Sequence, residues 1–289
     1  MSGQALRGGH LTAVRVWGQG ARQLLALHCS LAHAGAWAGL AAQLPGGICL
    51  TAPDLPGHGR SDPWLGTEDL HSVATRMATA LADQIKDMRA MAAKRSLDAG
   101  ALREELNLSL KTAFERNDKV LGIWLAFEPN GLDGKDSEFA NDAARQSNEA
   151  GRFATYWSRA AGASLNTIMV EEDLTKTTLS VSGTPYNSWY TCPRDAKRTC
   201  LLDPYADTVG GKEMLMTTIS VPLIVDGKAI GVVGVDIALD ALQAAAVDSQ
   251  RSLFNNAGHM LIVSGSGVLG ADSSDASKVG KKISDTLGA

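Results

Sequence analysis

The sequence predicts an α+β protein in which a long helix supports antiparallel sheets, preceded by a shorter segment of alternating strands and helices. Residues 83–115 repeat apolar side chains at helical spacing. Residues 214–225 and 228–237 are apolar strand patterns on either side of Asp226-Gly227, a dipeptide typical of tight hairpin turns. Composition also divides the chain, because all twelve lysines lie at position 86 or later and five of the six histidines lie before residue 72. These observations predict two segments that join near residues 80–86.

Composition excludes several classes of protein. The 289-residue chain is long enough for two domains, carries a net charge of -4 and has no basic run of the kind that binds nucleic acid. It contains no stretch of 18 apolar residues, so no membrane segment is expected in this chain, and its first residues lack the apolar core of a secretory signal. We therefore expect a globular protein with no nucleic-acid partner.

The first segment, residues 1–83, is predicted to fold as strand, helix, strand, helix. The apolar runs 23–29 and 48–52 predict short buried strands, and the Ala-rich stretch 30–44 predicts a helix between them. Residues 68–82 predict a second helix with Thr67 as its N-cap. This order implies parallel strands joined by crossover connections.

Two motifs of this segment, LLALHCSLAHAGAW at 24–37 and APDLPGHGRSD at 52–62, resemble the α/β-hydrolase family. The resemblance implies a partial βαβα fragment of that fold, and an esterase or lactonase is the alternative function. The family's nucleophile lies in a G-x-S-x-G turn, however, and the chain has no such pentapeptide; VSGSG at 263–267 comes closest. Without a nucleophile, oxyanion donors have no acyl transfer to stabilise. We therefore expect no catalytic residue and no enzyme, with His28 and His58 structural and with Cys29 and Cys49 as small core residues.

The second segment has an antiparallel pattern. The helical pattern at 83–115 breaks at Asp98-Ala99-Gly100. Strands are predicted at 119–128 and 151–160, followed by the hairpin around Asp226-Gly227. A short helix at 239–246 and a strand at 259–263 complete the series.

The stretch from Tyr186 to Asp207, YNSWYTCPRDAKRTCLLDPYAD, concentrates aromatic and acidic residues with two cysteines. Ring faces and carboxylates together suit a buried organic cation, because the ring quadrupole attracts the charge and the acid neutralises it. The alternative is a disulfide-pinned loop whose aromatic side chains are simply core.

Five motifs between residues 124 and 243 are similar to the double-Cache sensor domain of bacterial methyl-accepting chemotaxis proteins: WLAFEPNGLDGKD, GRFATYWSRA, YNSWYTCP, LLDPYAD and VPLIVDGKAIGVVGVDIALDALQ. The resemblance implies a long N-terminal helix with two stacked PAS-like modules, the second incomplete. Residues 84–245 are then the helix and the membrane-distal, ligand-binding module, and residues 246–289 begin the membrane-proximal module. The resemblance further implies a periplasmic sensor of a membrane-bound chemoreceptor, with no cofactor and with homodimerisation through the long helix.

The same resemblance implies the ligand class. The run Y-x-x-x-x-R-x-W-Y of amino-acid-sensing members is not evident, and the motifs at 189–193 and 202–207 resemble members that sense polyamines and other biogenic amines. A putrescine-, polyamine- or histamine-like amine is expected, with a choline-like quaternary amine or an amino acid as alternatives. Arg159 fits a cation site only if it faces outward or pairs with an acid.

The expected ligand-binding residues are aromatic or acidic, and for each aromatic residue the alternative is core packing. Strand alternation predicts that one of Tyr156 and Trp157 faces the core. Asp173 is a further candidate acid. The expected set is Tyr156, Trp157, Tyr186, Trp189, Tyr190, Asp203, Tyr205 and Asp207.

Cys192 and Cys200 flank a charged loop within this stretch. In a periplasmic domain we expect them to form a disulfide, which would rigidify the loop before Asp203. Two cysteines without a local histidine make an incomplete zinc set, so no metal is expected.

Overall fold

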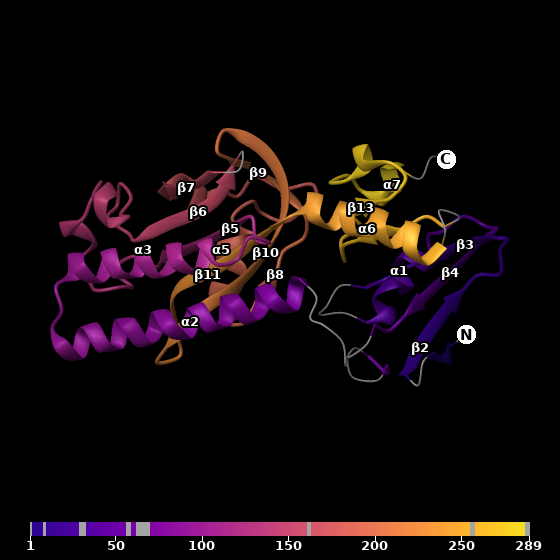
Figure 1. Ribbon diagram of the computed structural model, residues 1–289, viewed down its shortest axis with the longest axis horizontal. Helices are drawn as coiled ribbons and strands as arrows, with labels where there is room; N and C mark the ends of the chain where they lie inside the picture. The colour runs from indigo at the N-terminus through magenta and orange to yellow at the C-terminus, as the bar shows by residue number, and fades with distance from the viewer. Residues whose placement is uncertain are drawn as a thin grey trace. The chain divides into compact units, whose positions relative to one another are not determined.

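The computed structural model describes residues 2–7, 10–28, 33–55, 59–61, 70–160, 163–254 and 258–286 (Figure 1). Contacts divide the chain into a central unit, residues 70–238, and a terminal unit, residues 1–69 with 239–289. The sequence predicts boundaries near 83 and 245 instead. Both positions lie inside helices, α2 (Leu70–Arg95) and α6 (Leu239–Phe254), because neither carries a residue that ends a helix.

A seven-stranded antiparallel sheet forms the middle of the central unit. Its strand order is β7-β6-β5-β11-β10-β8, and β9 also pairs with β10. The predicted hairpin between β10 and β11 is present, and Asp226 and Gly227 take φ values of 49° and 73°, as a type I′ turn requires. The strands are β5 (Gly122–Phe127), β6 (Ala154–Ala160), β7 (Ala163–Ile168), β8 (Cys200–Leu201), β9 (Tyr205–Val209), β10 (Lys212–Val225) and β11 (Lys228–Ala238).

Two helices cover one face of this sheet. The single long helix implied by the resemblance is instead a pair, α2 and α3 (Ala99–Glu115), which reverse direction at residues 96–98 (Figure 1). The predicted break is explained by Asp98, whose side chain caps α3 by accepting a hydrogen bond of 2.9 Å from the Ala101 N–H. Apolar residues of both helices form the main core with the facing side of the sheet: Ile85, Leu106, Leu110, Phe114, Ile123, Leu125, Val233 and Val235.

Shorter elements cover the opposite face of the sheet. A second core forms there between α5 (Ser188–Ala196) and the sheet, with Trp189 and Tyr190 packed against Trp124 and Val232. Leu174 of α4 (Glu171–Thr175) joins this core. The loops that precede α4 contain the 3₁₀ turns η2 (Asp136–Glu138) and η3 (Ala143–Arg145). The sheet therefore separates a helix-covered face from an aromatic face.

The terminal unit contains a four-stranded sheet of order β1-β2-β4-β3. As predicted, β3 (Arg22–Leu25) and β4 (Ile48–Pro53) are parallel, but β1 (Ser2–Arg7) and β2 (His10–Trp17) add an unpredicted antiparallel side. The helix predicted at 30–44 is shortened to η1 (Ala34–Trp37) and α1 (Ala38–Ala41). The helix predicted at 68–82 is part of α2 in the central unit.

Single residues of this segment follow the sequence prediction in part. His28 is buried and accepts a hydrogen bond of 2.9 Å from the Leu55 N–H, a structural role. Cys49 is half-buried on β4 instead of lying in the core. Cys29, His58 and Thr67 lie outside the described residues.

The elements that follow residue 238 also belong to the terminal unit. After α6 come the antiparallel pair β12 (Leu261–Val263) and β13 (Leu269–Asp272), then η4 (Ala276–Lys278) and α7 (Ile283–Thr286). Within the described parts of the chain, none of the helices is long and apolar enough to cross a membrane.

A buried arginine ties α3 to the polar loop that follows β5. The guanidinium of Arg103 is fully buried and forms hydrogen-bonded ion pairs with Asp133 at 3.0 Å and Asp136 at 3.2 Å. We expect Arg103→Met to lower the free energy of unfolding by about 3–5 kcal/mol, because two carboxylates lose their buried partner. Urea unfolding measures the change. The control is Arg145→Met, whose exposed ion pair with Asp142 predicts a loss below about 1 kcal/mol; equal losses in both variants would contradict this role for Arg103.

Candidate functional site

The candidate site lies on the aromatic face of the sheet. Strand pairing brings Trp124 of β5 beside Tyr156 of β6, and the same register places Asp236 of β11 beside Thr218 of β10. All four side chains belong to the face opposite α2 and α3, because their neighbours Ile123, Trp157, Val235 and Ile237 contribute to the helix-side core. The sheet thus brings two aromatic rings, a hydroxyl and a carboxylate together.

Two strand glycines leave room for the aromatic rings. A Cβ on Gly234 would come within 2.1 Å of the Trp124 ring, and a Cβ on Gly122 within 2.4 Å of the Tyr156 ring. Each ring therefore lies across a glycine of the neighbouring strand. A larger residue at either position would displace the ring.

Asp236 is the most buried acid of this face, with 2% of its surface exposed. Its Oδ1 accepts hydrogen bonds from the Thr218 hydroxyl at 2.7 Å and from Trp124 Nε1 at 3.2 Å. Because the single hydroxyl proton of Thr218 is directed to Asp236, the Tyr205 hydroxyl must donate to Thr218 Oγ1, 2.8 Å away. A chain of hydrogen bonds thus leads from Tyr205 to the buried carboxylate.

The charge of Asp236 is not balanced by a counter-ion within the part of the chain that the structure describes. Burial raises the pKa of Asp236 to about 7, against the lowering effect of hydrogen bonds such as that from Thr218. Among the described residues, no lysine, arginine or histidine forms an ion pair with it. A bare buried carboxylate is costly, and a cationic ligand would offset that cost.

A second acidic position lies toward the solvent. Asp207 of β9 accepts a hydrogen bond of 2.7 Å from the Tyr186 hydroxyl, and the rings of Tyr186 and Tyr205 meet edge to face at 6.4 Å. Burial and the charge of Asp207 both raise the pKa of Asp173, in α4. Asp173 and Asp207 are therefore close enough for their charges to interact, and together they form the outer acidic position, with Asp236 as the inner one.

The aromatic face also has buried polar atoms without partners. Within the described residues, Trp189 Nε1 has no hydrogen-bond partner. The Tyr156 hydroxyl forms no hydrogen bond of good geometry, but it lies close enough to Asp236 to lower the pKa of that carboxyl group. Trp189 packs edge-on against Trp124, with ring centroids 4.8 Å apart. Burial, followed by the charge of Asp236, raises the pKa of Tyr156. Unpartnered buried groups are rare in proteins, and they are expected where a ligand supplies the partner.

Five of the eight predicted ligand-binding residues lie at this site: Tyr156, Tyr186, Trp189, Tyr205 and Asp207. Two of the others are occupied by contacts within the protein. Trp157 lies on the helix side, where its Nε1 donates to Asn107 Oδ1 at 2.8 Å, as strand alternation predicts for one member of the pair. The Tyr190 hydroxyl is already bonded to Arg152 and Glu128, so protein groups saturate it.

Within the described residues, neither Asp203 nor Arg159 forms a hydrogen bond or ion pair with the inner or the outer acidic position. Asp203 precedes β9, and no hydrogen bond or ion pair joins it to the other described residues. Arg159 donates to the carbonyl oxygens of Phe114 and Asn117 at the end of α3, at 2.9 and 3.0 Å. It therefore faces away from the site, which removes a cation that would oppose an amine.

Sequence reasoning missed Asp236, Trp124 and Thr218. The signal for Asp236 was a single carboxylate inside the apolar strand pattern IGVVGVDI. A charge placed where every neighbour is apolar is costly, and it marks a candidate functional position.

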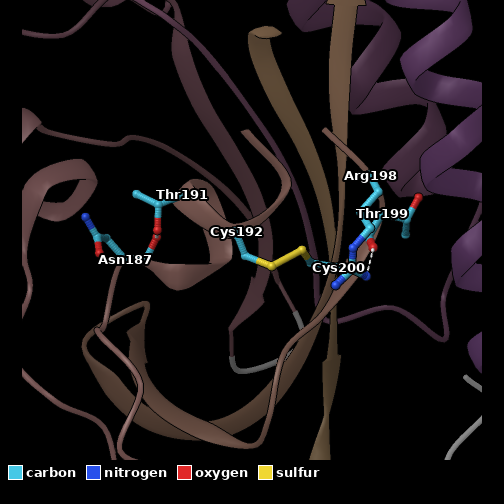
Figure 2. Close-up of a disulfide and its surroundings, with 6 residues drawn as sticks. All are labelled: Asn187, Thr191, Cys192, Arg198, Thr199 and Cys200. Carbon is cyan, nitrogen blue, oxygen red and sulfur yellow. Dashed lines mark hydrogen bonds between the residues drawn. A yellow bond between two sulfur atoms is a disulfide. The ribbon is translucent and has the colours of Figure 1, made fainter. Parts of the chain in front are cut away.

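Helix α5 is held in place at its middle and at its start. The disulfide expected between Cys192 and Cys200 is present and joins α5 to β8 (Figure 2). At the start of α5, Asn187 is buried and donates to the Leu174 carbonyl at 3.0 Å, which ties α5 to α4. Trp189 lies between these two anchors. In the parts that the structure describes, no cluster of three or more histidine, cysteine, aspartate or glutamate residues could hold a metal ion.

Comparison with known proteins shows which proteins the central unit is similar to. Residues 106–244 match the family model of the methyl-accepting chemotaxis protein-like first PDC sensor domain. The chain is 45% identical over 201 residues to methyl-accepting chemotaxis protein TlpQ of Pseudomonas aeruginosa, a match that covers 69% of this chain and 28% of that receptor. The chain therefore spans little more than a quarter of that relative.

Solved structures agree on the fold. The extracellular domain of histidine kinase mmHK1S-Z3 matches with a TM-score of 0.55 at 24% identity, over 75% of this chain and 68% of that one. The periplasmic sensory domain of the Campylobacter jejuni chemoreceptor Tlp1 matches with a TM-score of 0.51 at 13% identity, over 74% and 69%. These matches support a PDC/Cache sensor fold; the amine-sensing type and the hydrolase resemblance stay predictions.

The raised pKa of Asp236 predicts a pH-dependent stability in the absence of ligand. The folded protein keeps this proton up to about pH 7, whereas an ordinary aspartate loses it near 3.8. Protonation of Asp236 therefore stabilises the folded state fully below about pH 3.8, and this contribution is lost as the pH rises through about 7. Between pH 5 and 7, the native protein should lose up to about 1.4 kcal/mol per pH unit relative to Asp236→Asn.

Urea unfolding at pH 5, 6, 7 and 8 measures this difference. Asp203→Asn is the control, and its curve should run parallel to that of the native protein. If the Asp236→Asn curve is also parallel to the native curve, Asp236 does not titrate in this range.

Proposed function

Because residues 106–244 match the first PDC sensor domain of methyl-accepting chemotaxis protein-like receptors, we propose that this chain is the ligand-binding part of an extracytoplasmic chemoreceptor and that its ligand is a small organic amine. Sensor domains of this kind bind ligands and are not enzymes. The parent receptor is a membrane protein that carries the signal for chemotaxis across the bacterial inner membrane, with this unit on the periplasmic side.

One observation supports an amine as the ligand. Asp236 is buried in the sheet among aromatic side chains, and none of the described residues supplies it with a counter-ion. An ammonium group placed there donates a charge-assisted hydrogen bond to the carboxylate and is attracted to the faces of the rings. The Tyr156 hydroxyl, which lies beside Asp236, can accept a further hydrogen bond from the ammonium.

The same geometry ranks the alternative ligands. A quaternary amine such as choline satisfies the charge but has no N–H to donate to Asp236, so a primary amine fits better. An amino acid needs a cation for its carboxylate, and Arg152 is already engaged with Glu171 and the Phe127 carbonyl. The ammonium of Lys176, over the Tyr186 ring, interacts with the carboxylate of Asp173. Arg159 faces α3. We therefore favour a putrescine-, polyamine- or histamine-like amine.

The sheet offers a route from ligand to helix. Tyr156 faces the site, and its neighbour Trp157 donates to Asn107 of α3. We propose that ordering of β6 around the ligand alters its packing against α3. In the receptor, this change would be carried by the helices toward the membrane.

Calorimetric titration with putrescine, histamine, choline and a panel of amino acids tests the ligand class. We expect heat with primary amines in the native chain. Asp236→Asn should weaken amine binding roughly 10- to 100-fold, because it removes a charged hydrogen-bond acceptor. Asp207→Asn, at the outer position, should weaken it less.

The matched control is Asp203→Asn, which should bind as the native chain does. If no amine gives heat in the native chain, the amine proposal fails. If an amine binds with unchanged affinity in Asp236→Asn, the binding site lies elsewhere.

A further inference from the structure

The terminal unit contains a cavity that is separate from the candidate amine site. Its volume is about 1000 Å³, which is large enough for a small organic ligand. It is lined by residues of β3, η1, α1 and β4 from the start of the chain, and by the β12–β13 turn and α7 from the end. Both parts belong to the terminal unit and share one hydrophobic core.

Apolar side chains form one part of the cavity wall, and Trp37 adds a polar group to it. Trp37 is 6% exposed, and its Nε1 is buried without a hydrogen-bond partner among the described residues. Such donors are rare in proteins, and an acceptor atom of a ligand would complete this one. The apolar lining residues are Trp37, Leu40, Leu44, Ile48, Val263 and Ile283.

The charged part of the wall is positive. Arg22 of β3 and Lys282, which precedes α7, both line the cavity, whereas none of the lining residues is an aspartate or a glutamate. In the part of the chain that the structure describes, neither cation forms an ion pair with an acid. An anionic group in the cavity is therefore attracted by two cations, and an amine is repelled by both.

The VSGSG sequence, which comes closest to a hydrolase nucleophile turn, also lines the cavity. It forms the turn between the antiparallel strands β12 and β13, so it is not a strand–turn–helix elbow. The Ser264 hydroxyl accepts a hydrogen bond of 3.2 Å from the Val268 N–H and lies 3.1 Å from the Ser266 hydroxyl. The turn therefore supplies hydroxyl groups to the wall and no nucleophile.

We propose that this cavity is a second binding site, which takes an organic carboxylate with an apolar body, such as an aliphatic acid. The apolar side chains bury the body of the ligand, and the charges of Arg22 and Lys282 attract its carboxylate. The proposal does not depend on the amine-binding function, because all the lining residues belong to the terminal unit.

Calorimetric titration of the whole chain with octanoate and with 1-octanol tests the proposal, because the two compounds share a carbon chain and differ in charge. The variants are Arg22→Gln, Lys282→Gln and the double variant. The matched control is Lys281→Gln, which removes a charge from the neighbouring residue, one that does not line the cavity.

Octanoate should bind the native chain at least about 10-fold more tightly than 1-octanol, because only the anion is attracted by the two cations. Each single substitution should weaken octanoate binding about 3- to 10-fold, and the double variant should bind octanoate no more tightly than 1-octanol. Octanol binding should be the same in all variants, which would show that the cavity is still formed, and Lys281→Gln should bind both compounds as the native chain does.

Three results would overturn the proposal. They are the absence of heat with octanoate in the native chain, equal affinities of the native chain for octanoate and 1-octanol, and unchanged octanoate binding in the double variant.

Discussion

Asp236 holds a carboxylate in the middle of a sheet, where it is buried among aromatic rings and, within the described residues, forms no ion pair with a cation. Hydrogen bonds from Thr218 and Trp124 reduce the cost of that burial but do not remove it, as the pKa of about 7 records. The site around it follows from this constraint. Aromatic rings surround the carboxylate, and Tyr205 completes the hydrogen-bond chain. In the proposed function, the cationic group of a ligand supplies the missing charge.

One face of the sheet packs against the supporting helices, and the opposite face carries the candidate site. Helices α2 and α3 bury the apolar side chains of one face of the sheet, so the other face can carry polar groups without loss of the main core. Gly122 and Gly234 let two rings lie flat there. The disulfide between Cys192 and Cys200, together with Asn187, fixes α5 above the sheet. Such an arrangement is expected to hold the side chains that contact the ligand in fixed positions.

Local signals in the sequence predicted much of the fold. Asp226-Gly227 specifies its turn by its own backbone preferences, Asp98 caps α3, and alternation along β6 predicts that Tyr156 and Trp157 point to opposite faces. Features that depend on distant partners were not predictable in this way. Tyr190 is a residue type that often contacts cationic ligands, but its hydroxyl is hydrogen-bonded to Arg152 and Glu128, which are distant in sequence. Asp203 and Asp207 look equivalent in sequence, but only Asp207 lies on a strand that faces Tyr186.

The most direct test of this account is the proton balance of amine binding. Calorimetric titration of an amine at pH 6, in two buffers of different ionisation enthalpy, reports the protons released. At that pH Asp236 is mostly protonated and must ionise to pair with an ammonium, so binding should release about one proton, falling toward zero by pH 9. Equal heats in both buffers at pH 6 would show that the amine does not pair with a buried carboxyl group, and the central role of Asp236 would be wrong.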